Sequence, residues 1–153
     1  MFLEINKNVP IPQNLPAALE AAIVQLKESK DQTDCLQKAY QLLTTKYHGR
    51  RVKTYLRIFD LFFADINELW ERNGFLHCTN MNYLLRVLLV KSGFFKDEDI
   101  TARWTLIWYM SPHQYLVVRL ATGKNISVDM WSKSYGIALG NYAHGFNSQT
   151  HSA

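Results

Sequence analysis

The spacing of apolar residues along the chain changes at Gly93. Before this glycine, apolar side chains recur at intervals of three and four residues, as on one face of a helix. The clearest helical run consists of Met81, Leu84, Leu85 and Leu88. After it, residues 101–110, 113–120 and 125–131 are rich in β-branched and aromatic side chains, which favour strands. This order predicts an α+β fold, with N-terminal helices followed by a small antiparallel sheet.

Prolines and glycines set the expected limits of the helices. Residues 1–16 hold three of the four prolines and are predicted to form an extended arm. A first helix follows Pro16 and runs to about Lys30. A second helix is predicted to begin with a capping box formed by Asp34 and Gln37, and to end before Gly49.

Two further helices are expected before the sheet. The third is predicted to place Phe59, Phe62, Phe63, Ile66, Leu69 and Trp70 on one apolar face, and to end near Asn73-Gly74. The fourth runs from Cys78–Asn80 to Ser92, with Gly93 as its stop. The polar residues 147–153 are expected to fray, and residues 1–153 to form a single domain.

Composition narrows the class of protein. The 153 residues are 48% hydrophobic and hold only two cysteines, which excludes a disulfide scaffold and a four-thiolate zinc site. No apolar run reaches the length of a membrane span, and the N-terminus lacks the pattern of a secretory signal, so a cytoplasmic location is expected. The net charge of +4 is mild and does not indicate nucleic-acid binding. No metal or cofactor is expected.

Cys78, at the predicted start of the fourth helix, is the candidate nucleophile. The unpaired amides and the dipole at a helix N-terminus favour a thiolate and can also hold the oxyanion that forms when sulfur attacks a carbonyl. The alternative interpretation is that Cys78 is a small, buried apolar residue.

A nucleophilic thiol needs an imidazole that accepts its proton and later protonates the leaving group. Among the five histidines, His113 is favoured because it opens a predicted strand and can project toward the start of the helix. His77 is poorly placed because side chains adjacent in sequence point apart. The alternative for His113 is a polar residue at a strand edge.

Asp129 is the candidate for the group that orients the imidazole. A carboxylate among apolar strand residues is unfavourable unless it has a partner or reaches solvent. A three-residue loop at 122–124 pairs Ala121 with Asn125 and places Asp129 opposite Val117, on the same face as His113. The two side chains would then lie about 13 Å apart along the strand, a gap that a bulge or a fold-back near residue 111 would have to close. A two-residue loop would put them on opposite faces.

Three stretches carry a resemblance to the transglutaminase-like superfamily, a broad papain-like group of cysteine enzymes. They are Gly74–Gly93 (GFLHCTNMNYLLRVLLVKSG), Ser111–Leu120 (SPHQYLVVRL) and Ile126–Phe146 (ISVDMWSKSYGIALGNYAHGF). The resemblance covers about residues 70–146 and is nearest to the minimal bacterial and archaeal domains. Thr79 stands where animal-type transglutaminases have Trp, and no acidic calcium-binding loop is visible.

The resemblance implies a papain-like core with Cys78 as nucleophile, His113 as acid/base and Asp129 as orienting carboxylate. It implies cleavage of a peptide, isopeptide or other amide bond in a peptide or protein substrate, through a thioester. The alternative is a catalytically inactive module that binds peptide or protein.

Two groups of residues outside the triad also have alternative interpretations. Trp104 and Trp131 are candidates for binding the substrate, and their alternative is sheet core. The basic cluster Arg50, Arg51 and Lys53 is interpreted as a solvated helix start or as a contact for an anionic partner.

Overall fold

The computed structural model describes residues 9–58 and 65–150. The helices are α1 (Ala17–Lys27), α2 (Gln32–Lys46), α3 (Arg51–Leu56), α4 (Ile66–Glu71) and α5 (Cys78–Ser92), with short 3₁₀ helices η3 (Asp97–Asp99) and η4 (Trp131–Tyr135). The strands are β1 (Tyr47–His48), β2 (Gly74–Phe75), β3 (Ile100–Ile107), β4 (Ser111–Arg119), β5 (Asn125–Val128), β6 (Asn141–His144) and β7 (Asn147–Thr150). The predicted α+β class, with helices first and a small antiparallel sheet after them, is confirmed.

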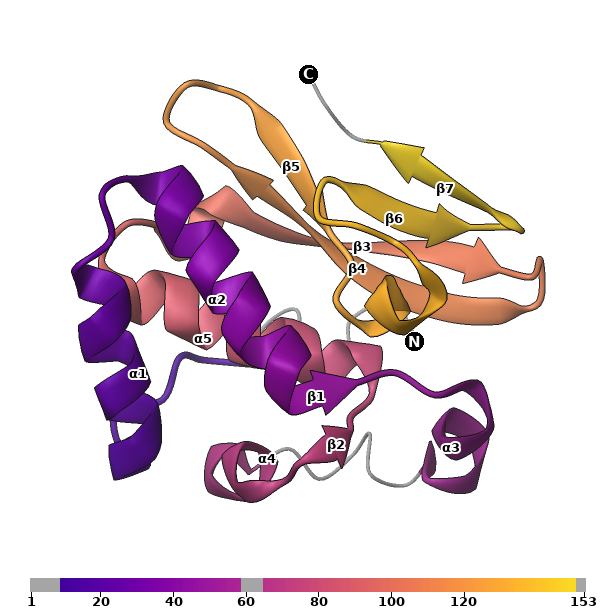
Figure 1. Ribbon diagram of the computed structural model, residues 1–153, viewed down its shortest axis with the longest axis horizontal. Coiled ribbons are helices and arrows are strands. Elements are labelled where there is room, and N and C mark those ends of the chain that lie inside the picture. Colours follow the sequence, from indigo (N-terminus) through magenta and orange to yellow (C-terminus); the bar gives the residue numbers. More distant parts are fainter. Residues whose placement is uncertain (1–8, 59–64, 151–153) are drawn as a thin grey trace.

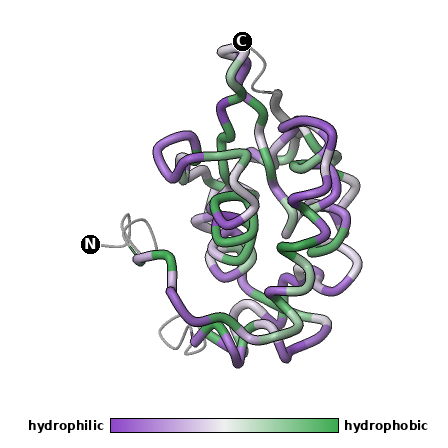
Figure 2. Tube along the Cα trace, turned by 90° about the vertical axis from the view of Figure 1, so that its left-hand side faces the viewer, coloured by the Kyte–Doolittle hydropathy of each residue, from purple (hydrophilic) through white to green (hydrophobic). Residues whose placement is uncertain are grey.

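Helix α5 lies at the centre of the domain. Strand β4, in the middle of the antiparallel sheet β3-β4-β5, packs against α5, and α1 and α2 pack against the same helix (Figure 1). The hairpin of β6 and β7 contacts β3 and β5 through β6. Hydrophilic stretches, drawn in purple, mark several of the outer turns of the trace in Figure 2. Because β4, α1 and α2 all pack against α5, the fold is built around this one buried helix.

The limits of α5 agree with the prediction from the sequence. The helix begins at Cys78 after His77 in extended conformation, and it ends at Gly93, whose left-handed φ of 84° suits a glycine at a helix C-terminus. All of its apolar residues except Cys78 and Val90 are buried, together with polar residues such as Asn82 and Arg86, as expected of a helix enclosed by other elements.

Other helix limits differ from the prediction. Helix α2 begins three residues before the expected position, because the carboxylate of Asp31, rather than that of Asp34, accepts the backbone N–H that caps the helix. The basic cluster opens a separate short helix, α3, and α4 begins after Asp65, whose carboxylate accepts the N–H groups of Asn67 and Glu68. The part of the predicted third helix at 59–64 lies outside the described residues.

The C-terminal segment also differs from the prediction. Residues 147–150 form β7, because their backbone pairs with β6 in the register that joins His144 to Asn147. Polar composition therefore did not prevent pairing in this segment. The last three residues lie outside the described part of the chain.

The register of β4 and β5 places Asp129 nearer to His113 than the sequence suggested. Leu116 pairs with Val128, so Asp129, the next residue, continues the register opposite Tyr115 and not opposite Val117. Asp129 and His113 share a face of the sheet and are two positions apart along β4, about 7 Å at the usual strand rise. The distance requires neither a bulge nor a fold-back at residue 111, and Ser111 already belongs to β4.

Among the described residues, no helix is both long enough and apolar enough to cross a membrane.

Two buried tyrosines, Tyr47 and Tyr40, allow a matched test of whether the hydrogen bonds from Tyr47 of β1 to α4 stabilise the fold. The Tyr47 hydroxyl donates to the carbonyl oxygens of Leu69 (2.7 Å) and Trp70 (3.1 Å) in α4, whereas the buried Tyr40 hydroxyl has no hydrogen-bond partner among the described residues. We expect Tyr47→Phe to lower the free energy of unfolding by about 1–2 kcal/mol, and Tyr40→Phe to change it by less than about 0.5 kcal/mol or to raise it. Chemical denaturation of both variants measures the difference, and equal losses would contradict it.

Candidate functional site

The site is organised around a buried pair of side chains from neighbouring strands. Nε2 of His113, the third residue of β4, lies 2.8 Å from Oδ1 of Asp129, which directly follows β5. The two side chains are 2% and 0% exposed. A carboxylate at this depth is tolerated only when hydrogen bonds and an opposite charge replace the water that it has lost.

The backbone supplies the remaining partners of Asp129. Oδ1 accepts the N–H of Ser132 in η4 (3.2 Å), and Oδ2 accepts the N–H of Ala143 in β6 (3.0 Å). Burial alone would raise the pKa of Asp129, but the charge of His113 and these hydrogen bonds lower it below its usual value. The side chain is therefore an ionised carboxylate at neutral pH, fixed by three elements.

Cys78 is the first residue of α5, so its position follows from where the helix begins. It is a free thiol and is half-buried. The first turn of α5 carries no acidic residue, and His77 makes no side-chain cap. The amides of this turn are thus not used by a capping side chain, and the helix dipole favours negative charge at the sulfur.

Cys78 and His113 line the same cavity. Burial disfavours the charged ring, but the Asp129 carboxylate outweighs burial and, together with the Cys78 sulfur, raises the pKa of His113 above its usual value. Since Nε2 faces Asp129, Nδ1 is the ring nitrogen left for the sulfur. The structure therefore brings the three predicted residues together: Asp129 bonds to the His113 ring, and the ring shares a cavity with Cys78.

A cavity of about 30 Å³ adjoins the sulfur and the ring. It is lined by Arg51, Thr54 and Tyr55 of α3, by Cys78, by Ile107, Trp108, Ser111, Pro112 and His113 of the β3–β4 hairpin, and by Trp131. The volume corresponds to about one water molecule.

The two predicted substrate-binding tryptophans have different positions. Trp131 lines the cavity, with its ring centroid 5.3 Å from that of His113. A Cβ at residue 49 would come within 2.4 Å of the Trp131 ring, so the glycine there permits this packing. Trp104 lies in β3 opposite Gln114 and is not among the residues that line the cavity.

Trp108 lines the cavity from the turn between β3 and β4. Trp108 and Tyr109 both have positive φ angles, 50° and 56°, although neither is glycine. Such a conformation costs on the order of 1–3 kcal/mol for each bulky residue, and strain of this kind is often found at functional sites. The turn places the indole against Arg51, with the guanidinium carbon 3.8 Å from the ring centroid.

The other described histidines are held away from the thiol. Nε2 of His77 lies 2.7 Å from the carbonyl oxygen of Arg57, and Nδ1 of His144 lies 2.5 Å from the hydroxyl of Thr105. His48 belongs to β1, where burial lowers its pKa. Only His113, among the described histidines, lines the cavity with Cys78.

Sequence reasoning did not assign Ser132 or Arg51 to the site. The Ser132 hydroxyl lies 3.3 Å from Nε2 of His113, so it adds a second polar contact to the ring. Its position three residues after Asp129 is a signal that was available, because a carboxylate often accepts the N–H three residues later at the start of a helical turn. The position of Arg51 depends on long-range packing and has no such local signal.

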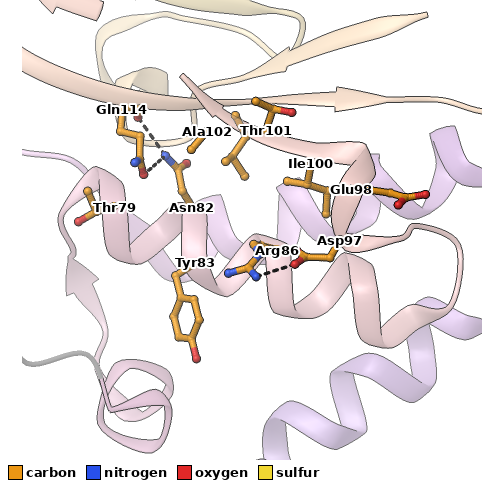
Figure 3. Close-up of a pocket in the computed structure, with 11 residues that line it drawn as sticks. Thr79, Asn82, Tyr83, Arg86, Asp97, Glu98, Ile100, Thr101, Ala102 and Gln114 are labelled. Carbon is orange, nitrogen blue, oxygen red and sulfur yellow. Dashed lines mark hydrogen bonds and ion pairs between the residues drawn. The ribbon is translucent and has the colours of Figure 1, made fainter. Parts of the chain in front are cut away.

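A second cavity, of about 210 Å³, lies between α5 and the start of β3 (Figure 3). Four of its polar side chains are paired with one another: the Asn82 amide donates to Gln114, and Arg86 pairs with Asp97 (Figure 3). The buried Thr79 hydroxyl, by contrast, has no hydrogen-bond partner among the described residues. No cysteine or histidine is among the described residues that line it. The described residues also contain no group of three or more potential metal ligands.

Comparisons with known proteins add no family: no family model matches the sequence, and no curated protein or solved structure matches it.

The buried pair of Asp129 and His113 should make the stability of the fold depend on pH. A carboxylate with a lowered pKa stabilises the fold above its ordinary pKa of about 4, and a histidine with a raised pKa does so below about 6.5. Asp129→Asn should therefore cost most, about 2–4 kcal/mol, between about pH 4 and 6.5. Below this window the cost should shrink as the pH falls toward the lowered pKa of folded Asp129. Above about pH 6.5, where His113 of the unfolded chain loses its proton, the cost should decline steadily until the pH reaches the raised pKa of folded His113, about 10.

Urea denaturation across the pH range measures the cost of Asp129→Asn. Glu98→Gln, which alters an exposed side chain 4.0 Å from Lys96, is the control and should change stability little at any pH. A cost for Asp129→Asn that is the same from about pH 3 to 9 would contradict a charged pair.

Proposed function

We propose that this protein is a cysteine-dependent acyl-transfer enzyme with a papain-like, transglutaminase-like core, which hydrolyses an amide bond in a peptide or protein. The observation that carries the proposal is that a half-buried thiol at a helix start lines the same cavity as a buried, carboxylate-bound imidazole. Thiol, imidazole and carboxylate in this order form a nucleophile, its base and the group that orients the base.

The proposed first half-reaction forms a thioester. The Cys78 thiolate attacks the carbonyl carbon, a carbon–sulfur bond forms, and the carbonyl electron pair moves to the oxygen. Backbone amides in the first turn of α5 stabilise this oxyanion. As the carbon–nitrogen bond breaks, the protonated His113 ring gives its proton to the nitrogen, and the amine departs.

The proposed second half-reaction releases the acyl group. Neutral His113 takes a proton from a water molecule, whose oxygen attacks the thioester carbon. The carbon–sulfur bond then breaks, and the products are a carboxylic acid and the thiolate–imidazolium pair of the resting site. An amine in place of water would give a new amide, so the same site supports transamidation. Hydrolysis is favoured because water is the default acceptor.

The proposed roles of Asp129 and Trp131 follow from the contacts that each side chain makes. Asp129 has its oxygens occupied by Ser132 and Ala143 as well as by His113, so it is suited to orienting the ring and stabilising its charge. Trp131 packs beside the ring and limits access of water to that side. In this proposal Asp129 and Trp131 are positioning residues, while Cys78 and His113 act on the substrate.

The alkylation of Cys78 by iodoacetamide tests the proposal. At about pH 6 an ordinary thiol, with a pKa of about 8.5, is less than about 1% ionised. If the proposed reaction is correct, His113 supports a thiolate at Cys78, and we expect Cys78 to be alkylated at least roughly tenfold faster than such a thiol at this pH. His113→Ala should remove the advantage, whereas His144→Ala, at an exposed histidine outside the cavity, should keep it.

Cys35 is an internal control for the same experiment. It is buried beside Ser92, and burial raises its pKa, so peptide-resolved mass spectrometry should find it unmodified while Cys78 reacts. A Cys78 rate that follows an ordinary thiol pKa in the wild type would contradict the proposed enzyme. It would favour the alternative, an inactive module that binds peptide or protein.

A further inference from the structure

The cavity beside Cys78 is lined by one charged side chain, Arg51, that has no role in the proposed reaction. Arg51 is the first residue of α3, and it lines the cavity together with Cys78 and His113. Its guanidinium carbon lies 3.8 Å from the centroid of the Trp108 ring, and its backbone N–H donates to the Tyr135 hydroxyl (2.9 Å). Contacts with the hairpin turn and with η4 therefore hold this exposed cation at the entrance to the sulfur.

The protein supplies no counter-ion for Arg51 among the described residues. From residue 100 to the end of the chain the sequence contains one acidic residue, Asp129, which is buried and bound to His113. The charged neighbours of Arg51 along the chain, Arg50 and Lys53, are also basic. The face around the cavity entrance is thus positive, and the balancing acidic residues lie on other elements.

The guanidinium group of Arg51 lies over the face of the Trp108 ring, a contact that needs no hydrogen bond from its N–H groups. A planar guanidinium held against an aromatic ring keeps its N–H donors in the plane of the group, where a carboxylate can accept two of them. The stack also limits the motion of the side chain, so less conformational entropy is lost on binding. Arg51 is therefore prepared to bind a carboxylate close to the reacting sulfur.

We propose that Arg51 determines the substrate class: the site takes an acyl substrate that carries a carboxylate near the scissile carbonyl. This inference rests on the proposed acyl-transfer function. The carboxylate binds the guanidinium at the entrance while the carbonyl reaches Cys78. An acidic side chain or the terminal carboxylate of a peptide provides the same chemistry.

Two alkylating reagents that differ only in charge test the inference. Iodoacetate carries the carboxylate and iodoacetamide does not, and in both the Cys78 thiolate displaces iodide. The wild-type ratio of the iodoacetate rate to the iodoacetamide rate should exceed that of Arg51→Met by about two- to fivefold, the range expected of one exposed ion pair. Arg51→Lys should retain part of the preference, and the preference should fall as salt is added.

Arg50→Met is the matched control, because it removes the same charge from the adjacent residue, which does not line the cavity. It should leave the ratio within about a third of the wild-type value, since its charge lies farther from the sulfur. Equal ratios for the wild type and Arg51→Met, with rapid iodoacetamide alkylation in both, would overturn the role of Arg51 and leave the enzyme proposal intact. Slow alkylation of the wild type by both reagents would overturn the enzyme proposal and this inference with it.

A second pair of probes separates the two sources of the carboxylate. Chloroacetyl-aspartate amide presents a side-chain carboxylate, and chloroacetyl-alanine presents a terminal one. The probe whose rate falls more in Arg51→Met identifies the source, and no fall for either probe would overturn the inference.

Discussion

The arrangement of the site depends on one buried carboxylate. Asp129 is fully enclosed, and it is accommodated because His113 and the amides of Ser132 and Ala143 all bond to it. These partners come from β4, η4 and β6, so the carboxylate joins the sheet to the segment that follows it. Removing the His113 ring would leave the buried carboxylate without its counter-ion, at a cost of several kcal/mol. The same bonds fix the orientation of the ring that meets Cys78, so one interaction links stability to the proposed chemistry.

The rest of the site is assembled by packing around this pair. Burial of α5 against β4 sets the distance between the sulfur and the ring, and α3 and the β3–β4 turn form the outer wall. Some of these parts are locally unfavourable: Trp108 has a positive φ angle, and Trp131 fits only because residue 49 is glycine. The core around α5 provides the stability that these positions lack. A site of this kind is held by the whole domain and not by a local motif.

The sequence predicted the parts of the fold and site that local pattern encodes. The limits of α5 follow from an apolar period that stops at Gly93, and Asp129 was identifiable because a carboxylate among apolar strand residues needs a partner. The register of β5 was wrong by two residues, because the N–H of Leu120 bonds to the carbonyl of Lys124, so this pair closes the three-residue loop in place of Ala121 and Asn125. Arg51 was not assigned to the site, since its contact with Trp108 depends on tertiary packing. Trp104 was predicted to bind substrate because it is an aromatic residue in a strand near the predicted triad. This pattern does not tell whether an aromatic side chain lines a given cavity, and Trp104 does not line the one beside Cys78.

The most direct test of the central claim is the protonation of His113, observed by nitrogen NMR of the ring in the wild type and in Cys78→Ala. If the ring is paired with both the carboxylate and the sulfur, both ring nitrogens carry protons at about pH 7 in the wild type, and the ring loses its proton at a lower pH in Cys78→Ala. A His113 ring that titrates near the ordinary value of about 6.5 in both proteins would contradict the account.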